Sequence, residues 1–495
     1  MKKMNLLAMS LVSAAALSFT SCSSNDDLTG GGTQSQADGV YMTLKISGAT
    51  SHGTRTGVTT PNTTENGEVV ESTISNGMLY IYDGSTCVFR KVITSDMFEK
   101  APTQTTAGVT KPIKVAVTGQ IKTNTEYTVY FLANNTSVND PLAANANFTS
   151  RNGGADFATN NNFVMFNQND GSRDAAVSKV TFTDAAKSEA TPAKADEIKL
   201  DRVVARIDQP KFKEVTTVTP AADTKTSINA GNVIEGIALE GYAVSNLNNT
   251  SYVKQNWTKV NTDWTLNVLT TGTPKYYLDK ATYGTTYKPA GLDNFGTDKW
   301  KYAFENTTTD VDDATAVYFK VKATLKEAAN NASDFKDNTF YRYDGRLYTS
   351  IKAIYDDAET GAISNPFTET GGIAAADVVN MIKDATTGLL TEDEAKLAKF
   401  REDYKIEVYR EGVMYYRWAI SDNVYKAFNP NEEINTYSVL RNSIYRLSVT
   451  KVNEIGKDVP NGPEPDDPNK NPNFYMNVKV SINPWVLNAQ PIELK

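Results

Sequence analysis

The chain has 495 residues, a formal net charge of −8 and 22% charged residues, an ordinary soluble composition that allows two or three domains. The acidic balance and the lack of lysine and arginine clusters among aromatic residues argue against nucleic-acid binding. The single histidine, His52, cannot build a histidine metal site or a zinc finger. No nucleotide-binding glycine loop, nucleophile elbow or Cys-x-x-Cys pair occurs. We therefore expect a protein that is not an enzyme, with no catalytic residues, no metal and no cofactor.

Residues 1–21 predict a secretory signal peptide, because two lysines precede an apolar run over 6–19 and two small residues. The apolar run is too short to span a bilayer. Cys22 follows directly, where a lipoprotein signal peptidase needs a cysteine. We predict that Cys22 is lipidated and gives a transient outer-membrane lipid anchor. The alternative is an ordinary signal peptide, since Phe19 stands where leucine is usual.

Residues 22–37 consist almost entirely of Ser, Asn, Asp, Gly, Thr and Gln, with few apolar residues. Such a composition cannot bury enough apolar surface to order itself. It predicts a flexible lipoprotein tether between the anchor and the first domain.

Short alternating runs come next and predict an all-β fold. The first series lies at 41–46, 79–82, 113–117, 127–134, 179–183 and 202–208, and the second at 233–244, 316–325, 404–420 and 437–452. Two tandem β-sandwich domains of transthyretin-like or Greek-key type fit these series best. We place them at 38–209 and 210–495, with the boundary at Gln209-Pro210.

A few helices are expected within the second domain. Thr391 and Glu394 have the spacing of a capping box, which predicts a helix that begins there and continues through Phe400. Another helix is predicted over 374–384. We interpret both as additions to the packing rather than as a partner site.

Four of these runs resemble those of the Bacteroidales fimbrillins, or type V pilins, and the likeness extends over nearly the whole chain. They are the YTVYFLAN strand (127–134), the RVVARID strand (202–208), the VYREGVMYYRWAI hairpin (408–420) and YSVLRNSIYRLSVTKVNEIG (437–456). A last strand containing Asn-Pro-Trp comes after them. The chain most closely resembles the major subunit of the short, or minor, fimbria.

The most specific element is Arg-Asn-x-x-Tyr-x-Leu-x-Val, which begins at Arg441. From the alternation alone, Arg441 and Asn442 are expected as structural polar residues. The expected core positions around them are Val439, Ile444, Leu447 and Val449.

The resemblance implies a fimbrial subunit exported as a lipoprotein and located at the cell outer membrane and in the surface fimbrium. A trypsin-like maturation protease would trim it at a loop after the first strand. The subunit would then polymerise with copies of itself, head to tail, by donor-strand exchange. Accessory tip and anchor subunits would join the filament, which would support adhesion.

The first strand, 40–47, alternates, and one face carries Val40, Met42, Leu44 and Ile46. A polar loop lies after it at 51–64, in which Arg55 is the only lysine or arginine. We predict proteolytic cleavage between Arg55 and Thr56, which would remove the lipid and the first strand together. The alternative is that Arg55 is only an exposed arginine in a loop.

The C-terminal segment 473–495 is the predicted donor strand. One face carries Phe474, Met476, Val478, Val480 and Ile482, and Trp485 could extend the contact. A Pro- and Asp-rich segment, 460–472, precedes it and cannot join a sheet. Inserting about five apolar side chains into a neighbour's groove would contribute on the order of 10 kcal/mol, before ordering costs. Alternatively, the strand pairs within its own domain.

The leading hypothesis is a structural shaft subunit, because a regular C-terminal donor strand is not expected in a tip subunit. A fimbrial tip or anchor subunit is the nearest alternative. A glycan-binding surface lipoprotein would use Trp257, Trp264 or Trp300 as stacking platforms, although tryptophans in alternating runs are more often in the core. A glycosidase would need two carboxylates that can be far apart in sequence.

Overall fold

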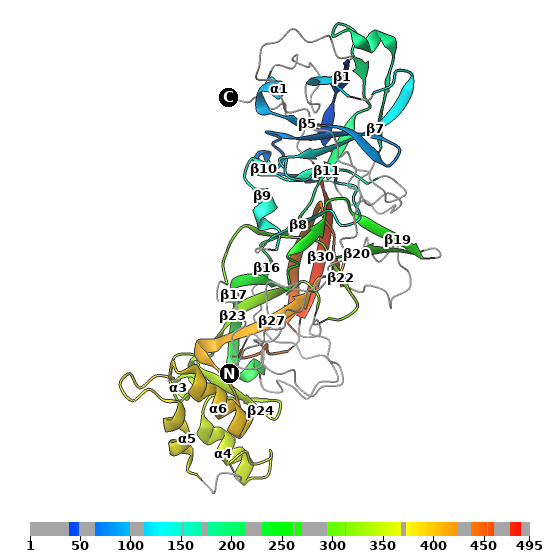
Figure 1. Cartoon of the computed structure of the whole chain (residues 1–495). Helices are drawn as coiled ribbons and strands as arrows, with labels where there is room; N and C mark the ends of the chain where they lie inside the picture. Colours follow the sequence, from blue (N-terminus) through cyan, green and yellow to red (C-terminus); the bar gives the residue numbers. More distant parts are fainter. Residues whose placement is uncertain are drawn as a thin grey trace, which may run out of the picture.

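Strands dominate the computed structural model, which confirms the all-β prediction. The structure describes residues 39–48, 65–99, 113–119, 121–150, 153–169, 177–212, 230–260, 263–269, 295–311, 313–367, 373–422, 437–452, 454–459 and 476–486. These residues form an elongated molecule, with the N-terminal strands at one end and most of the helices at the other (Figure 1). Within the described ranges, no helix combines the length and the apolar character needed to cross a membrane.

The N-terminal half surrounds one hydrophobic core that contains apolar residues from Val40 to Val204. Its largest sheet has the order β2-β14-β11-β7-β4-β5, with β12 also paired to β7, and a smaller sheet has the order β13-β1-β6. Its elements are β1 (Val40–Leu44), β2 (Ile46–Gly48), β3 (Glu65–Asn66), η1 (Val69–Glu71), β4 (Gly77–Asp83), β5 (Thr86–Ile93), α1 (Ser95–Glu99), β6 (Ile113–Val117), β7 (Thr125–Ala133), β8 (Asn147–Thr149), η2 (Ala155–Phe157), β9 (Ala158–Thr159), β10 (Asn162–Phe163), β11 (Met165–Asn167), β12 (Ser178–Phe182), η3 (Asp184–Lys187), β13 (Ala193–Lys194) and β14 (Ile198–Arg202).

β4 and β5 form a hairpin. The two strands pair antiparallel around Gly84, whose φ of 59° is the left-handed conformation that a tight turn needs. Cys87 lies after the turn on β5 and is partly buried against the first core.

The second half surrounds another core, which includes Ala205, Phe319 and Leu447. Its main sheet has the order β21-β15-β29-β30-β3, with β16 also paired to β29, and a second sheet has the order β17-β23-β27. Its elements are β15 (Ala205–Asp208), β16 (Lys211–Phe212), α2 (Ala230–Val233), β17 (Ile234–Ser245), β18 (Thr250–Tyr252), β19 (Asn256–Val260), β20 (Asp263–Asn267), β21 (Trp300–Ala303), β22 (Asn306–Thr308), β23 (Ala316–Leu325), η6 (Arg410–Gly412), β27 (Val413–Ala419), β28 (Tyr437–Val439), β29 (Ser443–Val452) and β30 (Met476–Val486).

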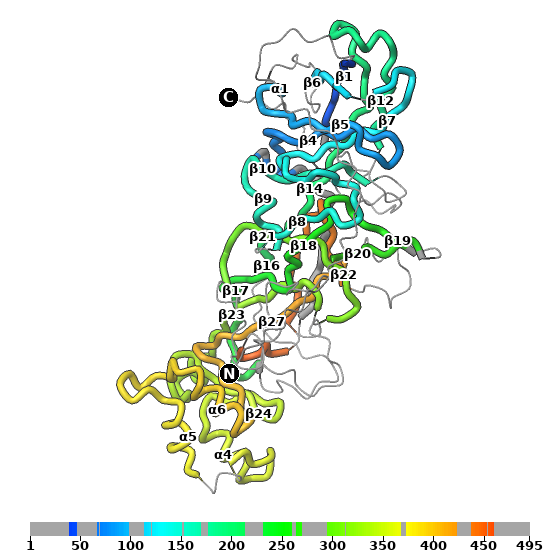
Figure 2. The backbone as a smooth tube through the Cα atoms, in the orientation of Figure 1, coloured from blue at the N-terminus to red at the C-terminus, as the bar shows by residue number. Residues whose placement is uncertain are grey.

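Val203 and Val204 pack in the first core and Ala205 and Ile207 in the second, a few residues before the expected boundary at Gln209-Pro210. Val253, Phe304 and Ile444 of the second half also pack into the first core. The run 202–208 reads as one strand, but a bend at 203–204 divides it. β14 before the bend joins the first sheet, and β15 after it pairs with β29 and β21. The two halves also touch where β8 pairs antiparallel with β18, near the middle of the chain trace in Figure 2.

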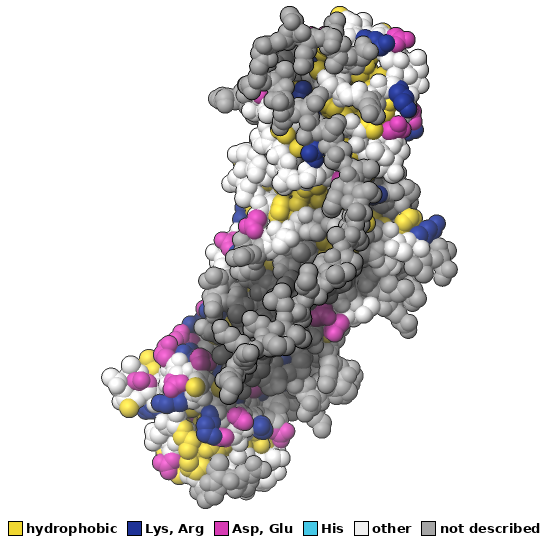
Figure 3. Space-filling view, in the orientation of Figure 1, with side chains coloured by type: hydrophobic (Ala, Val, Ile, Leu, Met, Phe, Trp, Pro, Cys, Tyr) yellow, Lys and Arg dark blue, Asp and Glu magenta, His cyan; other side chains and the backbone are white. Residues whose placement is uncertain are grey.

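Helices gather in an insert of the second half that has a hydrophobic core of its own. The insert comprises α3 (Glu327–Asn331), β24 (Phe340–Tyr343), β25 (Arg346–Tyr348), α4 (Ile351–Glu359), α5 (Ala375–Ile382), α6 (Glu394–Tyr404) and β26 (Glu407–Tyr409). Basic and acidic side chains are interspersed on the insert's visible surface, with no large patch of one sign (Figure 3).

The expected capping box at Thr391 and Glu394 is wrong. Asp393 is the N-cap of α6, because its carboxylate accepts hydrogen bonds from the amides of Ala395 and Lys396. Thr391 instead accepts from the amide of Asp393. The helix predicted over 374–384 is present as α5, and α4 was not predicted.

The expected hairpin over 408–420 is also wrong, because β26 pairs with β24 whereas β27 pairs with β23. Glu411 and Gly412 both have positive φ and redirect the chain between the two strands. A Cβ on Gly412 would lie 2.1 Å from the carbonyl oxygen of Ala323. Only glycine therefore fits this close backbone approach.

Candidate strand-exchange site

The first strand lies inside a sheet rather than at its edge. β1 pairs antiparallel with β6 over five positions, from Val40 opposite Val117 to Leu44 opposite Ile113. On its other side it pairs in parallel with β13. Both edges of β1 are thus occupied by strands of its own domain.

The predicted inward face of this strand is confirmed. Val40, Met42, Leu44 and Ile46 are each at most 2% exposed and belong to the first core, whereas the residues between them are half-buried. Such alternation is the burial expected for a strand with one face against a core. The role of this strand as the one displaced in assembly stays a prediction.

The strand continues past Lys45 into the large sheet, where β2 pairs in parallel with β14. Lys45 forms an ion pair with Glu197 at 2.9 Å, and its carbonyl accepts a hydrogen bond from the amide of Ile198. The first strand therefore contributes to both the small and the large sheet, and its removal would leave unpaired strand edges in both.

Removing β1 would leave a slot between β6 and β13. The whole first strand also includes Ile46 of β2, and its four buried apolar side chains at about 1.5–3 kcal/mol each correspond to roughly 6–12 kcal/mol of lost burial. This is comparable to the whole stability of a typical domain, about 5–15 kcal/mol. The slot would also have two strand edges with unpaired backbone groups, which favour addition of another strand.

The predicted donor strand forms β30, and in this single chain it pairs with β29 of its own second half. The antiparallel register places Val478 opposite Val449, Val480 opposite Leu447 and Ile482 opposite Tyr445. These three β29 partners are buried. Met476 and Trp485 also lie in β30, and Phe474 lies outside the described residues. In this single chain the last strand therefore pairs within its own domain, as in the alternative given above. In the exchange hypothesis, this is the arrangement before assembly.

The predicted lipidation and cleavage positions are not among the described residues. Cys22, Arg55 and Thr56 fall in the ranges 1–38 and 49–64, which the structure does not describe. The signal peptide, the tether and the cleavage loop therefore stay predictions from sequence.

The Arg-Asn element joins the two halves of the molecule. The expected core positions Val439, Ile444, Leu447 and Val449 are confirmed as buried, as are Arg441 and Asn442. The Asn442 amide nitrogen donates to Asp201, its side-chain oxygen accepts from the Arg202 amide at 3.3 Å, and its own backbone amide donates to the Val204 carbonyl at 2.9 Å. Asn442 therefore connects the turn before β29 to the end of the N-terminal half by hydrogen bonds.

Arg441 continues the junction on its other side. Its guanidinium forms an ion pair with Glu305 at 2.8 Å and donates to the carbonyls of Tyr252 and Val253. Gln255 connects Glu305 to Asn169 of the N-terminal half through side-chain hydrogen bonds. The ion pair and these hydrogen bonds connect buried polar groups across the boundary between the cores.

A second part of the junction was not predicted. Glu71, fully buried in η1, forms an ion pair with Arg206 at 3.0 Å and accepts a hydrogen bond from the Tyr302 hydroxyl at 2.7 Å. Burial, reinforced by the Glu71 charge, raises the pKa of Tyr302 well above its usual value, so its hydroxyl keeps the proton that it donates. Arg202 donates to the Glu71 carbonyl and to Ser72. The sequence contained one feature that could have indicated this part of the junction. Arg202 and Arg206 lie within an otherwise apolar strand run, and arginines in such runs need buried partners.

Replacing Asn442 by alanine is expected to destabilise the uncut chain by about 2–4 kcal/mol, because two buried partners lose hydrogen bonds and alanine fits its φ of 54° poorly. Urea unfolding measures this loss. Asn124→Ala is the matched control, since exposed Asn124 has a φ of 58° and should lose only about 1 kcal/mol from the backbone term. Equal losses in the two variants would contradict the junction role.

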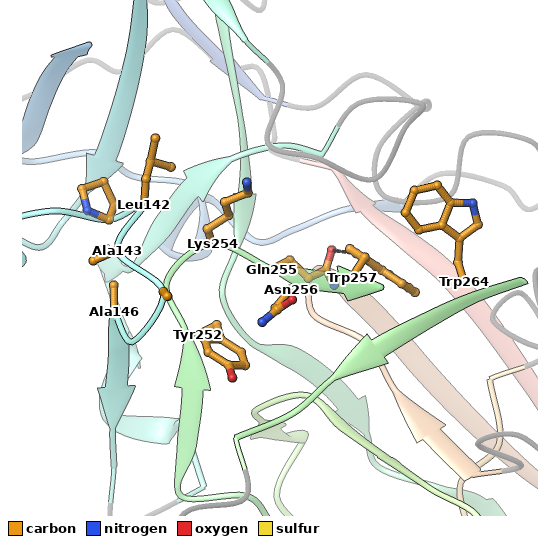
Figure 4. Close-up of a pocket in the computed structure, with 11 residues that line it drawn as sticks. Leu142, Ala143, Ala146, Tyr252, Lys254, Gln255, Asn256, Trp257 and Trp264 are labelled. Atoms are coloured by element: carbon orange, nitrogen blue, oxygen red, sulfur yellow. Dashed lines mark hydrogen bonds between the residues drawn. The ribbon is translucent and has the colours of Figure 1, made fainter. Parts of the chain in front are cut away.

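The tryptophans proposed for glycan stacking are engaged within the protein. Trp257 and Trp264 line a cavity of about 290 Å³ with Tyr252 and Gln255 (Figure 4). The indole N–H of Trp257 donates to Gln255 at 3.0 Å, and its ring packs against the core pair Leu266 and Leu440.

The other two rings face cations. The ammonium of Lys259 lies 5.6 Å from the ring centre of Trp264. Arg206 and Lys299 lie 4.7 and 4.3 Å from the ring of Trp300. These contacts do not favour a stacking platform for a sugar. Among the described residues, no cluster of His, Cys, Asp and Glu could hold a metal ion.

Residues 407–491 match the family model described as major fimbrial subunit protein type IV, fimbrillin, C-terminal. The match includes β27, β29, β30 and the Arg-Asn element. A search of curated proteins found no match. This match supports the resemblance to the fimbrillins inferred from sequence, over this C-terminal region.

Three solved structures are similar to this chain. A fimbrilin from Porphyromonas gingivalis has 14% identity and a TM-score of 0.41, with 92% of this chain and 99% of that chain covered. A candidate cell adhesion protein from Parabacteroides distasonis has 14% identity and a TM-score of 0.39, with the same coverage. Another candidate cell adhesion protein from that organism has 11% identity and a TM-score of 0.45, with 91% and 100% covered.

Proposed function

We propose that this protein is a structural shaft subunit of a surface fimbria that polymerises by strand exchange. It has the two elements that exchange requires: a first strand whose removal opens a slot, and a last strand with matching alternation. The observation that carries the proposal is the position of β1, paired on both edges and buried along one whole face. The family match at 407–491 supports a fimbrial subunit over an enzyme.

In the proposed pathway, the subunit is exported as a lipoprotein on Cys22 and reaches the outer membrane. A trypsin-like protease cuts between Arg55 and Thr56, which removes the lipid and the first strand in one step. The last strand of another copy then fills the slot between β6 and β13. Because the donor strand and the slot are different surfaces, each copy adds head to tail and the contact generates a filament.

Low-dose trypsin should cut the leaderless precursor once, early, after Arg55, and SDS-resistant ladders should then form. Arg55→Gln is expected to remove both the early cut and the ladders, because glutamine is not a trypsin site. Arg173→Gln, a change of the same type elsewhere in the chain, should leave both unchanged. Ladders from an Arg55→Gln protein that stays uncut would contradict the proposed activation. Gel electrophoresis and N-terminal sequencing provide the readout.

A further inference from the structure

One edge of the last strand pairs with a short segment that comes directly after the predicted cleavage loop. In the order β21-β15-β29-β30-β3, β30 lies between β29 and β3. Glu65 pairs in parallel with Trp485, and Asn66 with Val486. We call Glu65–Asn66 the latch strand. It comes from the N-terminal part of the sequence, yet it forms the edge of the second-half sheet.

The latch strand is anchored on its C-terminal side by residues of η1. Glu71, a few residues later in the sequence, is fixed by Arg206 and Tyr302, and the carbonyl of Val70 accepts a hydrogen bond from the amide of Asn161 at 2.7 Å. On its N-terminal side, the chain connects the latch strand to β2 through residues 49–64. A cut after Arg55 breaks this second connection and leaves the anchor at Glu71 intact.

The chain that leads to β30 is also fixed at its start. Asp458, whose side chain is 4% exposed, pairs with Arg401 and accepts a hydrogen bond from the amide of Val408 at 2.9 Å. Backbone hydrogen bonds join Lys457 to Tyr415. Residues 460–475 then connect to β30, and these sixteen residues can span at most roughly 55 Å. If β30 leaves its sheet, the movement must start after this fixed point.

We infer that the latch strand regulates release of the last strand, and that cleavage after Arg55 loosens it. The inference rests on the proposed function and deepens it. Before the cut, the chain continues from both ends of the latch strand to paired strands or helices. After the cut, the latch strand lies close to a free N-terminus, where short strands fray. The same cleavage thus opens the acceptor slot and loosens the donor strand, so donors become available only on subunits that are also acceptors.

Breaking the latch in the uncut, leaderless chain isolates this effect from assembly. The double variant Glu65→Pro, Asn66→Pro removes both backbone N–H groups of the latch strand. Amide hydrogen exchange over 476–486 is expected to become about tenfold faster, as for the loss of one or two backbone hydrogen bonds. Exchange over 40–44 should stay unchanged. Thr63→Pro, Thr64→Pro is the matched control and should leave the exchange over 476–486 as it is in the wild type.

A clamped chain tests the same inference in the opposite direction. Asn66→Cys, Val486→Cys joins two paired positions, in a chain that lacks Cys22 and carries Cys87→Ser. After trypsin cuts at Arg55, the oxidised form should give no ladders, and reduction should restore them. Unchanged exchange in the double proline variant, together with ladders from the oxidised clamp, would overturn the latch. Failure of the cut wild-type chain to form ladders would instead overturn the proposed function.

Discussion

Deleting residues 473–495 is expected to abolish the SDS-resistant ladders, while trypsin still cuts the protein after Arg55. The deletion removes β30, the strand that would fill the slot of the next copy. The rest of the second-half sheet should remain folded, because β29 keeps its pairings with β15 and β16 on the other edge. Circular dichroism and urea unfolding check the fold, and gel electrophoresis checks assembly. Ladders that persist after the deletion would refute this segment as the donor.

Two point changes test the same strand with less disturbance. Val480→Asp places a carboxylate on the predicted inward face of the donor and should abolish the ladders, since burying an unpaired charge costs several kcal/mol. Lys479→Asp places the same side chain on the opposite face and should leave ladders present. Equal assembly of the two variants would show that the alternation of this strand does not direct the exchange.

Leu44→Ala is expected to destabilise the uncut precursor by about 2–5 kcal/mol and to leave the assembled filament unchanged. Leu44 is fully buried in the first core, so truncation creates a cavity there. In the proposed filament, β1 would have been removed with the leader, so residue 44 would no longer be present. Urea unfolding measures the precursor, and the temperature at which the ladders dissociate in SDS measures the filament.

Leu79→Ala is the matched control for this prediction. Leu79 is a fully buried leucine of the same core, on β4, and it lies outside the removed segment. Its truncation should therefore destabilise both the precursor and the filament. A Leu44→Ala filament that dissociates at a lower temperature than the wild type would mean that the first strand is retained.

The strands of the candidate exchange site could be predicted from local sequence patterns. The period-two pattern of residues 40–46 is visible without any partner, and all four inward residues are buried. The same pattern identified β30 as a strand. It could not say which chain β30 pairs with, because a strand with one apolar face fits any groove of matching depth.

The junction was only partly predictable, because its contacts join residues far apart in sequence. Arg441 and Asn442 stood out as polar residues beside core positions, but their partners did not. Glu71 lies 135 positions from Arg206, and no local pattern links the two. The division of the run 202–208 was missed for a related reason: the run reads as one strand, although the bend at 203–204 sends its two parts into different sheets.

The helix α4 of the insert could not be predicted from sequence, because its amphipathic pattern is too short. α4 contributes only Ile351 and Ile354 as fully buried residues, which is too few to predict a helix from period alone. Its stability depends on packing with α5 and α6 in a core of their own. The insert could be recognised as a separate packing unit only in three dimensions.

A density map of the assembled fibre that resolves side chains tests the exchange most directly. We predict that residues 476–486 of each subunit lie between β6 and β13 of its neighbour, with the inward side chains where Val40, Met42 and Leu44 lie before the cut. A fibre in which residues 476–486 remain paired with β29 of the same subunit would contradict the account.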